Sequence, residues 1–310
     1  MPYASNASIE IYYEFAGDPK GPPILLIMGL GAQLVHWPSS LVDSLVELGC
    51  FVIRYDHRDV GMSSKLTALG PPNLSEIARA AASGRPASPP YTLSDMALDA
   101  LAVLDALGIA SAHVVGASLG GMVAQMLAIE HPGRVRSLTS IMSTTGARSL
   151  PPPSPEVLSM LMRSRSTDDP ERAIQDAIDS YRVLAVTPSD FDEARARIAA
   201  ELAHSRGVGA YGVARQLAAV LAASDREAHL AKLDLPCLVM HGALDPLISV
   251  EGGRRTQRCI PGSRIVVFPE MGHYLPARVV ESMVREIHQL IERCGRAEDA
   301  AVAPVPAQKP

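Results

Sequence analysis

The chain has 310 residues, of which 47% are hydrophobic and 20% are charged, and its formal net charge at pH 7 is −5. This apolar content excludes a disordered chain, and the negative charge gives no bulk attraction to nucleic acid or to an anionic membrane. The N-terminal residues have no signal-peptide pattern, and the longest apolar run is far short of the roughly 20 residues of a membrane-spanning helix.

The first half of the chain alternates between predicted strands and helices. Residues 24–28 (ILLIM) form a short, continuously apolar run that ends at a glycine, which is typical of a strand buried on both faces of a parallel sheet. Periodicity predicts, in chain order, strand 8–15, strand 24–28, helix 38–48, strand 51–55, helix 92–107, strand 112–115, helix 119–130 and strand 135–142. This alternation predicts a parallel sheet with helices on both faces.

The middle of the chain has a different pattern. Residues 154–230 contain only helical patterns, and the strand–helix alternation then resumes with strand 237–241, helix 252–259, strand 264–268 and helix 279–292. A helical block between two strands of one sheet indicates a cap. We therefore expect an α/β core from residues 1–143 and 233–295, a helical cap or lid from 144–232, and a disordered Pro/Ala-rich tail from 296–310.

The cysteines carry no sign of a metal or redox site. They are scattered along the chain, and none lies in a CxxC or Cys/His spacing suited to zinc. Free thiols of this kind are typical of a cytoplasmic protein. We expect no metal and no cofactor. The cysteines are Cys50, Cys237, Cys259 and Cys294.

A Gly-x-Ser-x-Gly pattern lies at residues 116–120, between a predicted strand and a predicted helix. A serine at the apex of so tight a turn has a strained backbone, and a Cβ atom at Gly116 or Gly120 would collide with its surroundings. The turn lifts the Ser118 hydroxyl above the carboxyl ends of the strands, where open α/β sheets bind ligands. Ser118 is therefore the predicted nucleophile.

A serine nucleophile needs a general base, and the base needs an orienting carboxylate. Among the nine histidines, His273 is the best candidate, because it lies in a loop after the last predicted strand; His241, at a strand end, could line the site or belong to the core. Asp245 follows strand 237–241, whereas the segment after strand 135–142 contains no carboxylate. The predicted order along the chain is Ser118, Asp245, His273.

Two backbone N–H groups are the expected donors of an oxyanion hole. The first is that of Leu119, at the N-terminus of the helix that follows Ser118. The second should come from the loop after strand 24–28, Met28-Gly29-Leu30-Gly31, whose glycines let the backbone approach a substrate closely. We assign Leu30 as this donor, with Gly29 as the less favoured choice.

These motifs resemble the α/β-hydrolase superfamily over nearly the whole chain. The residues that carry the resemblance are 28–31, 54–63 (RYDHRDVGMS), 116–121, 242–245 and 272–273. Within the superfamily the chain is similar to the carboxylesterase/lipase group that includes the aclacinomycin methylesterase. The resemblance implies a mostly parallel eight-stranded sheet with a helical cap inserted after the sixth strand. The chain departs from it at Met28, where most relatives have histidine, and in the loop 66–91, which is longer.

The remaining candidates are structural or line the pocket. We interpret Asp56, Arg58 and Ser63 as a buried network that fixes the turn after strand 51–55, not as a charged site. One residue beside the oxyanion loop and three in the helical block are expected to line the substrate pocket. They are Trp37, Met160, Leu217 and Leu221.

The predicted function is that of a serine carboxylesterase acting on small to medium uncharged esters through an acyl-enzyme. Its expected partner is a small-molecule ester, not nucleic acid, and its oligomeric state stays open. Another serine-hydrolase reaction (C–C bond hydrolysis, proline iminopeptidase-like amide cleavage or perhydrolysis) uses the same side chains and is an alternative. A non-catalytic receptor built on the same fold is the alternative from a different class.

Overall fold

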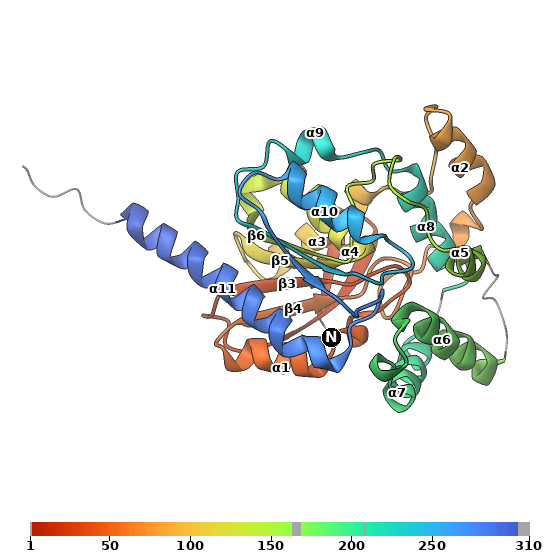
Figure 1. Ribbon diagram of the computed structural model, residues 1–310, viewed down its shortest axis with the longest axis horizontal. Helices are drawn as coiled ribbons and strands as arrows, with labels where there is room; N and C mark the ends of the chain where they lie inside the picture. Colours follow the sequence, from red (N-terminus) through yellow and green to blue (C-terminus); the bar gives the residue numbers. More distant parts are fainter. Residues whose placement is uncertain (1, 163–168, 208, 303–310) are drawn as a thin grey trace, which may run out of the picture.

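The computed structural model describes residues 2–162, 169–207 and 209–302, and within them eight strands form one sheet (Figure 1). The sheet order is β1-β2-β4-β3-β5-β6-β7-β8, with β1 and β2 antiparallel at one edge and the other strands parallel. The predicted fold class is confirmed. The strands are β1 Tyr3–Asn6, β2 Ile9–Ala16, β3 Pro23–Ile27, β4 Phe51–Tyr55, β5 Ala112–Ala117, β6 Val135–Ile141, β7 Cys237–Gly242 and β8 Arg264–Phe268.

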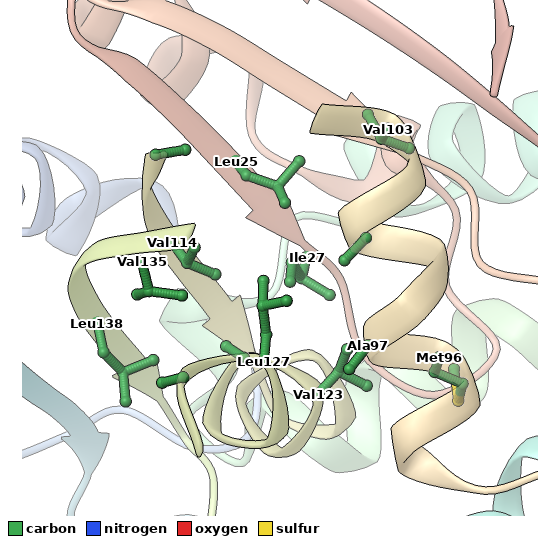
Figure 2. Packing of buried hydrophobic residues seen from close by; sticks show 14 of the residues in the cluster. Leu25, Ile27, Met96, Ala97, Val103, Val114, Val123, Leu127, Val135 and Leu138 are labelled. Atoms are coloured by element: carbon green, nitrogen blue, oxygen red, sulfur yellow. The ribbon is translucent and has the colours of Figure 1, made fainter. Parts of the chain in front are cut away.

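Helices cover both faces of the sheet because the central strands are apolar on both sides. Leu25 and Ile27 of β3 pack into one cluster with α3 and α4, whereas Ile24 and Leu26 pack into another with α1 and α11. Figure 2 shows the first cluster, in which Leu25 and Ile27 lie near α3 and α4. The helices outside the insert are α1 Ser39–Glu47, α2 Leu74–Ala82, α3 Leu93–Ala106, α4 Leu119–Glu130, α10 Val250–Cys259 and α11 Ala277–Val302.

The helical block expected after the sixth strand lies between β6 and β7. Figure 1 shows α5 to α8 gathered at one end of the sheet, whereas α9 lies beside α10. The inserted helices are α5 Pro155–Met162, α6 Pro170–Ala185, α7 Glu193–Ser205, α8 Gly212–Ala222 and α9 Glu227–Leu230. Over the described ranges, no helix combines the length and apolar character that crossing a membrane requires.

Two ends of the chain differ from the sequence-based expectation. Strand β1 was missed, because Tyr3–Asn6 (YASN) has no strand-like alternation and is specified only by its pairing with β2. Helix α11 continues to Val302, so the expectation of a disordered tail is wrong for residues 296–302. These residues include good helix formers, which extend the helix past Gly295. Residues 303–310 of the expected tail lie outside the described residues.

The predicted turn network after β4 extends into the inserted helices. Asp56 accepts hydrogen bonds from the backbone N–H of Leu34 (2.8 Å) and Met62 (2.8 Å) and pairs with Arg206 at the end of α7 (2.8 Å). The Ser63 hydroxyl donates to the carbonyl oxygen of Asp56 (2.6 Å). The insert is thus attached to the core by charged groups buried in this turn.

A second charged contact joins α8 to the same turn. Arg215 is completely buried, and its Nη2 and Nε donate to the two carboxylate oxygens of Asp59 at 2.6 and 2.8 Å. The Tyr91 hydroxyl donates to the same carboxylate (2.9 Å). Because burial removes water from both charges, each depends on the other for its solvation.

Replacing Arg215 with methionine should therefore destabilise the protein strongly. Asp59 would be left buried without its cation, and such losses are typically about 3–5 kcal/mol. Urea unfolding at neutral pH measures the effect. The matched control is Arg254→Met, which removes an exposed arginine paired with Glu251 and should change stability little. Equal midpoints for the two variants would contradict the importance of the Arg215 contact.

Candidate active site

Ser118 lies at the apex of a tight turn between β5 and α4, as the sequence predicts. Its backbone has φ 55° and ψ −118°, a conformation that side-chain-bearing residues rarely adopt. A Cβ at Gly116 would lie 2.2 Å from the carbonyl oxygen of Gly120, and one at Gly120 would lie 2.0 Å from that of Ile27. Glycine is therefore required on both sides of the serine.

The structure brings Ser118, His273 and Asp245 together in one hydrogen-bonded chain. The Ser118 Oγ lies 2.9 Å from Nε2 of His273, and Nδ1 of His273 lies 2.7 Å from Oδ2 of Asp245. An ionised carboxylate only accepts hydrogen bonds, so Nδ1 carries the proton and Nε2 presents its lone pair to the serine hydroxyl. All three residues are buried, with 8–9% of each residue's surface exposed. The imidazole is thus placed to take a proton from Ser118.

The Asp245 carboxylate is held by its own loop and by two histidines. Its Oδ1 accepts the backbone N–H groups of Leu247 (2.9 Å) and Ile248 (2.8 Å). His241 Nε2 lies 2.8 Å from the carbonyl oxygen of Ile248 and 3.3 Å from Asp245 Oδ2. Burial favours a raised pKa, but His273 and His241 outweigh it and hold the pKa of Asp245 well below its usual range. The carboxylate is therefore ionised at neutral pH.

This arrangement also decides between the two histidines that the sequence offered. His241 lies beside Asp245, and its Nε2 is occupied by the Ile248 carbonyl oxygen. His273 alone of the two makes a hydrogen bond with Ser118 within the described part of the chain. His241 is completely buried and supports the loop that carries Asp245.

The inserted helices help to hold the His273 loop. The backbone N–H of His273 donates to the carbonyl oxygen of Leu184, near the end of α6, at 2.8 Å. A Cβ at Gly272 would lie 2.4 Å from that same oxygen. The Gly-His pair is therefore needed for the close approach of α6 as well as for the imidazole. Nothing in the sequence of α6 indicated this contact.

The loop of residues 28–33, here called the oxyanion loop, passes next to Ser118. A Cβ at Gly29 would lie 3.2 Å from that of Ser118. His57 Nε2 lies 2.8 Å from the carbonyl oxygen of Met28 and holds the start of the loop. Among the described residues, the N–H groups of Gly29, Leu30 and Leu119 have no protein acceptor, whereas that of Gly31 donates to Gln216. The two predicted donors, Leu30 and Leu119, are therefore available to a substrate oxygen, and so is the less favoured Gly29.

Ser118 and His273 line a cavity of about 1100 Å³ between the core and the inserted helices. Of the predicted pocket residues, Trp37, Met160 and Leu217 also line it. The expectation for Leu221 is wrong, because α8 borders the cavity through Val213, Ala214 and Leu217, and Leu221 lies one turn further along. The described residues that line the cavity include no carboxylate.

His36, next to Trp37, also lines the cavity and forms with Tyr181 a polar pair in its apolar wall; the Tyr181 partner is what sequence reasoning missed. His36 Nδ1 lies 2.9 Å from the backbone nitrogen and 3.1 Å from the carbonyl oxygen of Gln33, and its Nε2 lies 2.7 Å from the Tyr181 hydroxyl oxygen. Burial lowers the pKa of His36, which keeps this imidazole neutral. Within the described ranges, no cluster of His, Cys, Asp or Glu is arranged to hold a metal ion.

The chain belongs to the α/β-hydrolase family, because residues 22–276 match the family described as alpha/beta hydrolase fold. It is 31% identical over 303 residues to the rhodomycin D methylesterase DnrP of Streptomyces peucetius, covering 91% of this chain and 95% of the relative. It is 32% identical over 301 residues to the rhodomycin D methylesterase DauP of Streptomyces sp. strain C5, covering 90% and 94%. An esterase structure from Rhodococcus sp. ECU1013 shares the fold, with a TM-score of 0.70, 22% identity, and coverage of 94% and 97%.

Proposed function

We propose that this protein is a carboxylic ester hydrolase in which Ser118 is the nucleophile, His273 the general base and Asp245 its orienting carboxylate. The observation that carries the proposal is the hydrogen-bonded chain of 2.9 and 2.7 Å that links three separate loops at the wall of a cavity. The two Streptomyces relatives are named as methylesterases, which supports an ester as the substrate.

The proposed reaction begins when the Ser118 Oγ attacks the ester carbonyl carbon while His273 Nε2 takes the hydroxyl proton. The carbonyl oxygen becomes an oxyanion that the N–H groups of Leu30 and Leu119 stabilise. Asp245 stabilises the imidazolium that forms. His273 then gives its proton to the leaving alcohol, and an acyl-enzyme remains. Water, activated by the same imidazole, releases the acid.

The cavity favours an ester that carries no positive charge and has a sizeable apolar part. Its volume of about 1100 Å³ lies at the upper end of ordinary ligand pockets, so it also accommodates larger esters than we expected from the sequence. The described lining residues include no carboxylate and two arginines, Arg54 and Arg195. Arg54 is paired with Glu14 at 3.0 Å. A cationic substrate would find no countercharge there. Methyl esters of bulky apolar acids are the proposed substrate class.

We expect the catalytic efficiency on 4-nitrophenyl esters to rise from acetate to butyrate to octanoate. Each buried CH₂ contributes about 0.8 kcal/mol, so octanoate should exceed butyrate at least ~10-fold in kcat/KM. The control compares butyrylcholine with its neutral isostere 3,3-dimethylbutyl butyrate, and the cation should be the poorer substrate. If kcat/KM were the same for the three 4-nitrophenyl esters and butyrylcholine were hydrolysed efficiently, the result would contradict an apolar pocket that excludes cations.

Labelling with a fluorophosphonate tests the proposed chemistry directly. The probe phosphonylates a serine only when a base and an oxyanion hole activate it. Peptide mapping should place the label on Ser118, and prior incubation with a good ester substrate should slow the labelling. A folded protein that stays unlabelled under conditions that label other serine hydrolases would favour the non-catalytic receptor.

We also propose that separate parts of the chain serve catalysis and substrate binding. Residues 1–143 and 233–295 form the catalytic core, and residues 144–232 form a cap that covers it. Residues of α5, α6, α7 and α8 line the cavity, which supports a role of the cap in substrate binding.

The cysteines are free thiols, which supports the reducing cytoplasm as the place where the protein acts.

A further inference from the structure

Gln216 on α8 connects the inserted helices to the oxyanion loop. Its side chain is completely buried, and its Oε1 accepts the backbone N–H of Gly31 at 2.8 Å. Its Nε2 donates to the carbonyl oxygen of Arg58, in the turn after β4, at 2.9 Å. One amide thus ties together three segments that are far apart in the sequence. A buried amide with both ends satisfied is a rigid connection, because losing either partner would leave a polar group without water.

Two further contacts fix the same loop from the side of the insert. A Cβ on Gly31 would lie 3.0 Å from the Val213 side chain, so α8 packs closely on this glycine. Further along the loop, Gln33 donates from Nε2 to the carbonyl oxygen of Ala203 (2.8 Å) and accepts from Arg206 Nε (3.1 Å). The insert therefore contacts the oxyanion loop at two separate points.

The loop needs such support because its own sequence does not fix its conformation. Gly31 has φ +70°, a backbone conformation available to glycine at little cost, and glycine is also the residue with the most alternative conformations. The Gly31 N–H belongs to the peptide bond directly after Leu30. By holding this peptide, Gln216 limits backbone rotation at Leu30 and so restricts the direction of the Leu30 N–H. An oxyanion donor is effective only when its direction is set before the reaction.

We propose that Gln216 is a positioning residue for the oxyanion hole, so that α8 of the insert completes the catalytic site as well as lining its cavity. The inference rests on the proposed function, and it concerns one step of it. Gln216 does not line the cavity, so it does not act as a substrate contact. Its effect should appear in the stabilisation of the tetrahedral oxyanion and not in the binding of the ester.

The test is Gln216→Met, which keeps the length and helix propensity of the side chain and removes both hydrogen bonds. With 4-nitrophenyl butyrate, kcat should fall about 10-fold or more, while KM changes less than about 3-fold. n-Butylboronic acid forms a tetrahedral adduct with the serine, and its inhibition constant should rise by about the same factor by which kcat falls. The matched control is Tyr91→Phe, which removes the Tyr91 hydrogen bond to the Asp59 that anchors α8 but leaves Gly31 untouched. It should retain nearly all of kcat.

Each outcome decides one question. A folded Gln216→Met protein with unchanged kcat and unchanged boronate affinity overturns the positioning role. Equal losses in Gln216→Met and Tyr91→Phe also overturn it, because they would indicate a general effect of loosening α8. If Gln216→Met does not fold, Gln216→Ala replaces it with the same expected losses; unchanged kcat and unchanged boronate affinity in that folded variant would overturn the proposal. Ser118→Ala, measured in parallel, reports on the proposed function independently of Gln216.

Discussion

Replacing Ser118 with alanine is expected to lower kcat for 4-nitrophenyl butyrate at least ~1000-fold. The alanine removes the Oγ that lies 2.9 Å from His273 Nε2, and no other hydroxyl occupies that position among the described hydrogen bonds. The fold should be unaffected, because β5, α4 and the flanking glycines are unchanged. Alanine is smaller than serine, so the strained turn is no more crowded than before. Steady-state rates with thermal unfolding of the same sample measure both effects.

The matched control for this variant is Ser137→Ala. Ser137 is also buried and lies on β6, where its hydroxyl contacts His113 inside the sheet (2.8 Å). Its loss should lower the unfolding temperature slightly and leave kcat near the wild-type value. Substantial ester hydrolysis by Ser118→Ala, in a preparation free of other esterases, would contradict the proposed nucleophile.

Replacing Asp245 with asparagine should lower kcat by about 10⁴-fold near neutral pH. The asparagine amide can donate to Nδ1 of His273, which moves the ring proton to Nε2, where the lone pair is needed to accept the Ser118 proton. KM should change little, because Asp245 does not line the cavity. The exposed Asp43→Asn on α1 serves as the control and should behave like the wild type.

The same substitution has a pH signature in stability. The pKa of Asp245 in the folded protein is below its usual value, so folding favours the ionised form. The stabilisation is fully present above the ordinary aspartate pKa and is lost as pH falls through the lower pKa of the folded state. The free energy of unfolding of Asp245→Asn should therefore be lower than that of the wild type at pH 7. The difference in free energy of unfolding between the two proteins should become smaller only below about pH 4. A gap that is constant down to acid pH would contradict the ionised state.

Much of this architecture follows from local patterns in the sequence. Continuous apolar runs such as residues 24–28 predicted strands covered on both faces, and the two clusters around Ile24 and Leu25 confirm this reading of the pattern. The side chains at 118, 245 and 273 could be selected because each follows a predicted strand, and the carboxyl ends of parallel strands meet at one edge of the sheet. Their roles remain a proposal, whereas their proximity is observed.

The features that could not be predicted depend on contacts between distant segments. Gln216 is one polar residue in a helical pattern, and only the three-dimensional structure shows that it faces Gly31. Leu221 repeats the spacing of Leu217, but sequence periodicity does not tell where along α8 the cavity ends. Strand β1 exists through its pairing with β2. In each case the information lies in tertiary packing and not in residue order.

The contact between α6 and the His273 loop has a consequence for redesign of this protein. The carbonyl oxygen of Leu184 accepts the hydrogen bond of the His273 backbone, and Leu184 also lines the cavity. Because main-chain atoms make this hydrogen bond, any residue compatible with a helix can supply it at position 184. Substitutions at position 184 can thus alter substrate selectivity while the His273 imidazole stays in place. A cap taken from another protein would instead have to place a carbonyl oxygen at the same position to accept the His273 N–H.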